Sequence, residues 1–220
     1  MTMMDIVPVL LNLAQKRPVF HIEADFQHAL AWTLHEAHPT AEIRLERVAP
    51  NPDERNHIDI CARVDEDQLF IELKYKTRGL KLTLEGETFD LQDQAAQVVS
   101  RYDFFKDIQR LEQAVWSQQN SFGYAILLTN DSAYWKGLGN NMVYEQFATN
   151  EGRKLEQGGK YDWKPNTSPG TKRGREEAIH IKGEYRFHWQ DYSKPSQDRY
   201  GEFRFLLVGV SNHPTELTRR

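Results

Sequence analysis

Two carboxylates and one lysine lie on neighbouring segments that the sequence predicts to be strands. Asp59 falls within residues 56–64. Glu72 and Lys74 fall within residues 68–76. Both segments alternate apolar and polar residues, which is typical of half-buried strands. The short acidic stretch between them leaves room only for a tight connection, so we expect an antiparallel hairpin whose polar face carries all three side chains.

The expected pairing of the two strands brings these side chains within reach of one another. A two-residue turn that pairs Asp65 with Gln68 places Asp59 directly across from Lys74. Glu72 is then the diagonal neighbour of Asp59. A slip of two residues would keep the same side chains on the same face. The opposite face would carry the apolar residues, which are Ile58, Ile60, Ala62, Val64, Leu69, Ile71, Leu73 and Tyr75.

Paired carboxylates beside a lysine suit the metal-dependent hydrolysis of a phosphate ester. Two converging carboxylates bind a hard divalent cation such as Mg²⁺ through oxygen and leave positions for water and a phosphate oxygen. The cation lowers the pKa of bound water, and a lysine can orient that water or stabilise developing charge. The alternative is that Asp59, Glu72 and Lys74 form the solvated face of an edge hairpin. Residue types and spacing leave both interpretations open.

A further carboxylate stands in an apolar stripe near the N-terminus. Residues 22–37 have the periodicity of an amphipathic helix, and Glu23 falls on the same side as Phe26 and Leu30. A carboxylate on a core-facing first turn is unusual, so we expect Glu23 to face the hairpin. The alternative is an ordinary acid near a helix N-terminus, which the helix dipole favours.

Length and composition restrict the class of protein. The 220 residues can bury one substantial core, so we expect a single domain. The one cysteine, Cys61, rules out an internal disulfide and fits a reducing cytoplasm. No apolar run approaches membrane-spanning length, and the first residues lack the basic region of a secretory signal. The net charge of −4 means that a nucleic-acid surface must be a local basic patch.

Other segments supply the elements that would position the site. We expect a helix over 5–17, a strand over 42–48, and a short ribbon over 81–89 that turns at Gly86. Residues 91–118 predict helix capped by Asp90 or Asp93, with a break near Asp103 where the apolar phase jumps. Further strands are expected over 122–129, buried on both faces, over 179–191 with a bend at Gly183, and over 203–210.

Residues 130–178 are the least regular part of the chain and carry many cations. The basic residues are Arg153, Lys154, Lys160, Lys164, Lys172, Arg173 and Arg175, interleaved with Tyr161 and Trp163. Such a loop suits a phosphate backbone, and it is equally consistent with a loop that is merely solvated.

The order of helix, strand, hairpin, helix and strand, with Asp59 followed by Glu72-Leu73-Lys74, resembles the core of the PD-(D/E)xK nuclease superfamily. The resemblance covers about residues 20–130 and implies a restriction-endonuclease-like α/β fold, a central mixed sheet flanked by helices. No motif in 131–220, the C-terminal strands and the basic loop, contributes to it. No proline precedes Asp59, and Lys76 offers a second cation on the same face.

The resemblance also implies roles for particular residues. Asp59, Glu72 and the Leu73 carbonyl would hold Mg²⁺, or Mn²⁺, while Lys74 positions the attacking water. Glu23 would support the metal through a water molecule. Nucleic-acid contacts are expected from Gln94 and Arg101 on the following helix, from Lys76, and from the basic-loop residues Lys172, Arg173 and Arg175.

Three functions follow as hypotheses. The first is a metal-dependent DNA endonuclease of the restriction or defence type, for which a twofold-symmetric homodimer would suit a double-strand cut. The second is a catalytically inactive module that keeps the fold and binds nucleic acid or joins a complex. The third, a thiol enzyme built on Cys61 and His57, lacks any evident oxyanion donor or helix terminus to activate the thiol.

Overall fold

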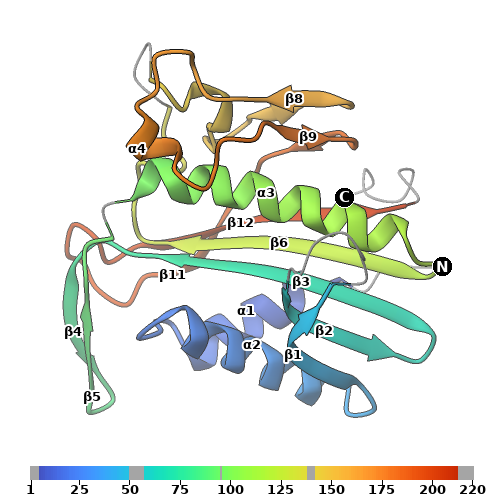
Figure 1. The fold of residues 1–220 in the computed structure, drawn as a ribbon. Coiled ribbons are helices and arrows are strands. Elements are labelled where there is room, and N and C mark those ends of the chain that lie inside the picture. Colours follow the sequence, from blue (N-terminus) through green and yellow to red (C-terminus); the bar gives the residue numbers. More distant parts are fainter. Residues whose placement is uncertain (1–4, 50–56, 95, 138–141, 213–220) are drawn as a thin grey trace.

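A six-stranded sheet forms the centre of the protein (Figure 1). The computed structural model describes the chain except for residues 1–4, 50–56, 95, 138–141 and 213–220. In spatial order the strands are β1 (Glu42–Val48), β2 (His57–Val64), β3 (Asp67–Lys76), β6 (Ser121–Thr129), β12 (Phe203–Ser211) and β11 (Trp189–Ser193). β3 and β6 run parallel, and all other neighbours run antiparallel. The sheet is therefore mixed, as predicted.

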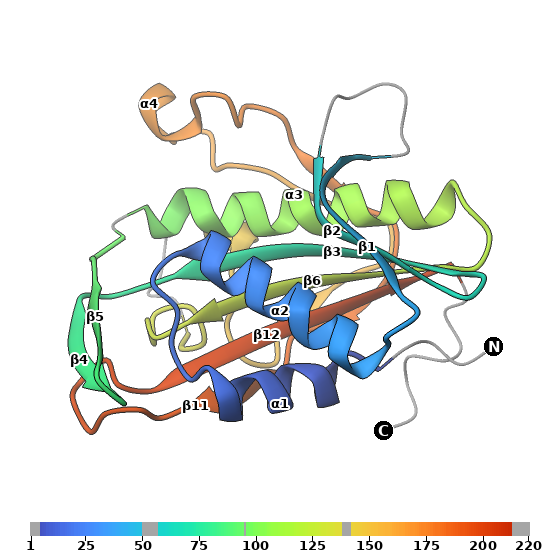
Figure 2. The same cartoon turned by 90° about the horizontal axis from the view of Figure 1, so that it is seen from below.

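Helices cover both faces of this sheet (Figures 1 and 2). α1 (Val7–Lys16) and α2 (Glu23–Ala37) lie on one face, and α3 (Gln97–Trp116) lies on the other. All nine residues of β6 are buried, because a central strand covered on both faces has no solvent-facing side. The predicted α/β class, with a mixed sheet between helices, is confirmed, and so are the helices and strands expected up to residue 76.

α3 is one continuous helix, so the predicted break near Asp103 is wrong. The jump in apolar phase has another cause, which is that the helix is buried on two sides. Near its start Tyr102 stacks on Trp163 of the C-terminal region, at 5.3 Å between ring centroids. Further along, Leu111 faces Gly123 of β6. A helix between two layers needs two apolar stripes, which mimic a break in the pattern.

The segment before α3 forms the predicted ribbon. β4 (Leu80–Leu84) and β5 (Glu87–Leu91) pair around a turn in which Gly86 has a φ of +87°. Neither predicted acid caps α3. Asp90 lies within β5, and Asp93 accepts a hydrogen bond from the backbone N–H of Gly79. The N-cap position is Ala96, which makes no side-chain cap.

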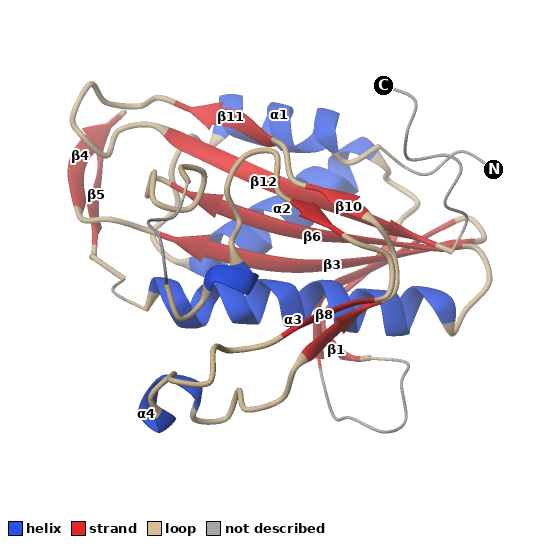
Figure 3. Ribbon diagram, turned by 90° about the horizontal axis from the view of Figure 1, so that it is seen from above, coloured by secondary structure: helices blue, strands red, loops and turns tan. Residues whose placement is uncertain are grey.

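The C-terminal third adds two strands to the sheet and a layer of short elements over α3 (Figures 1 and 3). The short elements are η1 (Glu145–Phe147), β7 (Lys154–Leu155), β8 (Gly159–Tyr161), α4 (Pro169–Lys172), β9 (Ile179–Ile181) and β10 (Tyr185–Arg186). The final strand over 203–210 is confirmed as β12. In the described ranges, no helix has both the length and the apolar content needed to cross a bilayer.

The predicted strand over 179–191 is divided into β9, β10 and β11, with the expected bend at Gly183. A buried carboxylate on α3 explains the division. Glu112 accepts hydrogen bonds from the backbone N–H groups of Lys182 and Gly183 and from the hydroxyl of Tyr185. These N–H groups are therefore used by a side chain, and a strand cannot continue through them.

Candidate active site

The hairpin of β2 and β3 forms with a register shifted by two residues from the predicted one. Val64 pairs with Asp67 and Arg63 with Gln68, so the turn consists of Asp65 and Glu66. Asp65 adopts a φ of +54°, as tight hairpin turns require. The predicted crossing of Asp59 with Lys74 is therefore wrong. The pairing Ile60 with Ile71 brings Asp59 level with Glu72 instead, on the same face as before.

At Asp59 a side chain takes the place of the backbone in the pairing between β2 and β3. Its carboxylate Oδ2 accepts the backbone N–H of Leu73 at 2.6 Å, and its carbonyl accepts the side-chain amide of Gln27 at 2.7 Å. The neighbouring residue of β1, Glu46, has a φ of +51°, a conformation that costs energy for a non-glycine residue. A side chain thus replaces a strand-to-strand contact at this point of the sheet.

Beyond this irregularity, the side chains of β1 and β2 change faces of the sheet. Ile60 belongs to the core beneath α1 and α2, whereas Ile58 belongs to the core beneath α3. The prediction that Ile58 shares the face of Ile60 is therefore wrong. Simple alternation fails here because the left-handed backbone conformation of Glu46 rotates β1, so that the residues after it point to the opposite face. β2 stays paired with β1, so its side chains change face at the same place.

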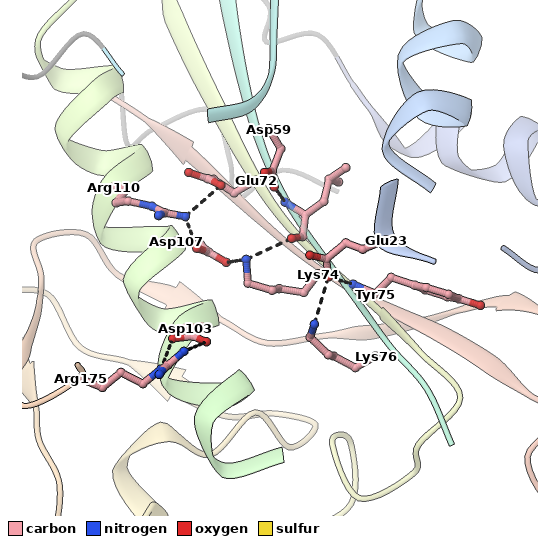
Figure 4. Close-up of polar contacts among 11 residues, drawn as sticks. Glu23, Asp59, Glu72, Lys74, Tyr75, Lys76, Asp103, Asp107, Arg110 and Arg175 are labelled. Carbon is pink, nitrogen blue, oxygen red and sulfur yellow. Dashed lines mark hydrogen bonds and ion pairs between the residues drawn. The ribbon is translucent and has the colours of Figure 1, made fainter. Parts of the chain in front are cut away.

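Glu72 and Lys74 project from β3 toward α3 and meet two charged residues of that helix (Figure 4). Arg110 Nη2 lies 3.1 Å from Glu72 Oε2 and 2.5 Å from Asp107 Oδ1. Lys74 Nζ lies 2.8 Å from Asp107 Oδ2 and donates to the Leu73 carbonyl at 3.2 Å. The side chain of Glu72 is only 1% exposed and that of Asp107 3%. The result is a buried chain of alternating charges between β3 and α3.

Glu72 is incompletely satisfied in this network. Neither of its carboxylate oxygens accepts a hydrogen bond from the described part of the chain, although Arg110 provides an opposite charge. Burial raises the pKa of Glu72 well above its ordinary value, Asp107 adds to the rise, and Arg110 opposes it. A buried carboxylate that accepts no hydrogen bond from the described residues costs free energy, which the charge of Arg110 offsets only in part.

Asp59 and Lys74 respond differently to burial. Burial raises the pKa of Asp59 to about 6, against the lowering effects of the Leu73 N–H group and Lys74. Burial alone would lower the pKa of Lys74, but Asp107, with Glu23 and Asp59, raises it above the ordinary lysine value. Lys74 is therefore a fixed cation rather than a proton acceptor at neutral pH.

Glu23 faces the hairpin, as its place in the apolar stripe predicted (Figure 4). Its Oε2 accepts the backbone N–H of Tyr75 at 2.7 Å and lies 3.2 Å from Lys76 Nζ. Phe26, one turn further along α2, is fully buried in the core beneath the sheet and anchors this end of the helix. Glu23 is 42% exposed, so solvent reaches it from the open side of the site.

Of the two residues predicted on the following helix, Arg101 is enclosed within the protein and Gln94 precedes the helix. Arg101 is 1% exposed, donates to the Thr149 hydroxyl and the Ala133 carbonyl, and lies over the ring of Tyr134. It is a structural cation between α3 and the C-terminal region and cannot contact nucleic acid. Gln94 is exposed in the segment before α3, where its backbone N–H donates to Thr77.

The basic loop is also less available than its composition indicates. Tyr161 and Trp163 are buried against α3, so they pack in the core and offer no exposed surface for stacking on bases. Arg175 forms a bidentate ion pair with Asp103, in which Nε donates to Oδ1 at 2.6 Å and Nη2 donates to Oδ2 at 2.8 Å. Lys172 ends α4 and is partly buried, and the next residue, Arg173, is exposed.

Asp107 and Arg110 are the site residues that sequence reasoning missed. They lie three positions apart on α3, so they project from one side of the helix. The signal was present as charges next to the apolar stripe of Ile108 and Leu111. It was not decisive, because charges at such spacing are usually solvated.

The thiol hypothesis is contradicted by the environment of Cys61. The residue is buried, and burial raises the pKa of its thiol to about 11, while Glu72 and Asp59 also disfavour the thiolate. His57 is exposed at the start of β2. A nucleophilic cysteine needs a lowered pKa, so Cys61 is a small core residue beside the carboxylates.

The donor set suits a hard cation, although no ready-made cage is present. Glu72 offers two buried oxygens that accept no hydrogen bond within the described part of the chain, and Asp59 and the Leu73 carbonyl offer oxygen close by on the hairpin. Within the described ranges, however, no three side chains among His, Cys, Asp and Glu are grouped closely enough to hold a metal ion. Comparisons with protein-family models, curated proteins and solved structures find no match.

Proposed function

We propose that this protein is a metal-dependent DNA endonuclease of the restriction or defence type, with a PD-(D/E)xK fold. One observation carries the proposal. Glu72 is buried and its two carboxylate oxygens accept no hydrogen bond from the described residues, and it lies level with Asp59 and two residues from the charged Lys74. That arrangement is costly for stability and is suited to binding a divalent cation next to a phosphate.

Each residue has a role in this proposal. Asp59, Glu72 and the Leu73 carbonyl hold Mg²⁺ or Mn²⁺, and Glu23 supports the ion through a water molecule. The bound cation would lower the pKa of water and neutralise the phosphate. Lys74, fixed by Asp107, orients that water and stabilises the charge that develops on the phosphate oxygens. Arg110 balances the charge of Glu72 and has to withdraw when a cation binds.

A catalytically inactive module that binds nucleic acid is the second candidate. The ion pair between Arg110 and Glu72 favours it, because a built-in cation already neutralises the carboxylate. The two candidates differ in whether a divalent cation can replace Arg110 beside Glu72.

Partners and location belong to the same proposal. DNA is the substrate, and a homodimer related by a twofold axis would present one site to each strand of a duplex. We place the protein in the cytoplasm, where its single cysteine stays reduced. Light scattering with and without a duplex would establish whether one or two chains bind.

The decisive experiment compares the wild type with Glu72→Gln. Labelled linear, supercoiled, single-stranded and branched DNA is incubated with Mg²⁺, Mn²⁺ or Ca²⁺, and the affinity for the metal is measured by calorimetry. We expect Glu72→Gln to lose hydrolysis by several powers of ten and to bind the metal more weakly. DNA binding in EDTA should persist or tighten, because a negative charge facing the phosphates has gone.

Glu202→Gln is the matched control, because it makes the same change in an exposed carboxylate away from the site. It should alter neither metal binding nor hydrolysis. If the wild type binds DNA but cuts none of these substrates with Mg²⁺ or Mn²⁺, and Glu72→Gln has no effect, the catalytic proposal is wrong and the binding module stands.

A further inference from the structure

Three arginines from β1 and β2 surround a pocket beside the carboxylates. The pocket has a volume of about 320 Å³, and Arg44 and Arg47 of β1 line it together with Arg63 of β2. Glu42 and Gln68 complete its polar wall. All three arginines are exposed, so their guanidinium groups are accessible from solution.

The reversal of the strands at Glu46 is what gathers these arginines. Arg44 pairs with Cys61, which lies in the core beneath α3. Arg47 is three positions later and would point to the opposite face of a regular strand. Because the backbone of Glu46 is left-handed, Arg47 instead shares the face of its partner Ile58, which also lies in the core beneath α3. The strained backbone therefore adds a cation to this face.

The pocket adjoins the candidate active site. Cys61 lines it and stands two residues from Asp59 on β2. Neighbouring strands lie about 4.8 Å apart and same-face residues about 7 Å apart, so Arg44 is roughly 8 Å from Asp59 along the sheet. In Figure 2 the C-terminal end of β1 and helix α4 both extend beyond α3 on the same side of the protein.

The charges of the pocket are only partly neutralised by its own wall. Arg63 Nη2 lies 2.6 Å from Glu42 Oε1, which pairs these two residues. Arg44 makes a local contact, donating to the Ile43 carbonyl at 3.0 Å. One wall carboxylate thus faces three guanidinium groups, and a guanidinium matches the geometry of a phosphate oxygen pair.

We propose that Arg44 and Arg47 bind a backbone phosphate of DNA next to the phosphate that is hydrolysed. The inference rests on the proposed function, because it takes Asp59 and Glu72 as the place of hydrolysis. Arg63 contributes less, since Glu42 already holds it. The contact is independent of base sequence, and it would fix the position of the strand relative to the cation.

The test measures DNA affinity by fluorescence anisotropy in EDTA over a series of salt concentrations. The logarithm of the binding constant falls linearly with the logarithm of the salt concentration, and each phosphate contact removed should make this negative slope shallower by about 1. In the double variant Arg44→Gln/Arg47→Gln, we expect the slope to become shallower by about 2. Binding should weaken by about tenfold for each arginine, as expected for the loss of charge-assisted hydrogen bonds. Arg186→Gln removes one exposed strand arginine from β10 and is the control for net charge alone.

A second measurement uses the unmodified protein and so does not depend on the variants folding. Phenylglyoxal labels accessible arginines, and mass spectrometry identifies the labelled sites. Bound duplex DNA should protect Arg44 and Arg47 but leave Arg186 reactive. Inorganic phosphate alone should protect little. Protection by phosphate equal to that by DNA would make the pocket a site for small anions and overturn the assignment.

The two proposals fail in different ways. If the wild type neither binds nor cuts DNA, the proposed function fails. If the wild type binds and cuts, but the double variant keeps the wild-type salt slope or changes it no more than Arg186→Gln does, only the phosphate pocket is wrong.

Discussion

Arg110 balances the most deeply buried charge of the candidate site. Its guanidinium bridges Glu72 and Asp107, and its own side chain is 21% exposed. Removing one partner of a buried ion pair leaves an uncompensated charge, which is far more costly than the pair itself is stabilising. A divalent cation beside Glu72 would supply the same compensation from outside the chain.

We therefore predict that Arg110→Met lowers the free energy of unfolding by about 3 kcal/mol in EDTA. Millimolar Mg²⁺ should recover much of this loss and should stabilise the variant more than the wild type, as urea denaturation would measure. Lys106→Met removes a cation one turn earlier on α3 and serves as the control. Equal stabilisation of wild type and Arg110→Met by Mg²⁺ would show that the cation does not bind where Arg110 now acts.

Asp59 makes stability depend on pH in a defined direction. Its pKa is raised to about 6 in the folded protein from an ordinary value of 3.8. The folded state therefore binds the proton more tightly than the unfolded state does. The stabilisation is fully present below about pH 4 and is lost as the pH rises to about 6.

We predict that Asp59→Asn removes this dependence. Between about pH 4 and about pH 7 the wild type should lose up to about 3 kcal/mol of unfolding free energy relative to the variant. Asparagine can still accept the N–H of Leu73 through its carbonyl oxygen. Asp90→Asn makes the same substitution at an exposed acid of β5 and is the control. A flat difference for Asp59→Asn would contradict the raised pKa.

At the scale of elements, the contact between α3 and β6 determines where Asp107 and Arg110 lie. Gly123 of β6 lies directly against Leu111 and Val115 of α3. A methyl group added there would lie 3.1 Å from Val115 Cγ2 and 3.2 Å from Leu111 Cδ2. These distances are shorter than ordinary van der Waals contacts, so the helix would have to move away from the sheet.

Gly123→Ala should accordingly lower the free energy of unfolding by about 1 to 3 kcal/mol, through overpacking of the core. It should also reduce DNA hydrolysis, because α3 carries the two residues that hold Lys74 and Glu72. Thermal melts and cleavage rates would measure the two effects. In Gly170→Ala the new methyl group meets no atom of the described residues within 4 Å, so neither quantity should fall. Unchanged cleavage in a destabilised Gly123→Ala would separate α3 from the chemistry.

For the whole molecule, the question is which cations of the basic loop face a partner and which hold the fold together. Arg175 ties the loop to α3 through Asp103, whereas Arg173, two residues earlier, is exposed. The same kind of residue therefore has two different environments within one short segment.

Arg173→Ala should weaken DNA binding several-fold and make the slope of log K against log salt shallower by about 1, with little change in melting temperature. Arg175→Ala should have the opposite profile, with a lower melting temperature and a nearly unchanged salt slope. Anisotropy titrations and thermal melts on both variants distinguish the two. If Arg175→Ala reduces the slope as much as Arg173→Ala does, the ion pair with Asp103 opens when DNA binds.

The sequence by itself determined the features that depend on local pattern. The hairpin, its polar face with Asp59, Glu72 and Lys74, and the orientation of Glu23 all follow from alternation or helical periodicity. The buried strand β6 follows from its continuous apolar run. These features hold because a period of two or of 3.6 residues assigns each side chain to a face before any partner is known.

Tertiary structure decided what covers each face. The reversal at Glu46 and the double burial of α3 depend on segments far away in the sequence. So do the enclosure of Arg101 and the meeting of Arg110 with Glu72. A charged residue next to an apolar stripe has the same local sequence whether it meets solvent or a buried carboxylate. Only the packing of α3 against β3 distinguishes the two, because the charge network exists between elements rather than within one.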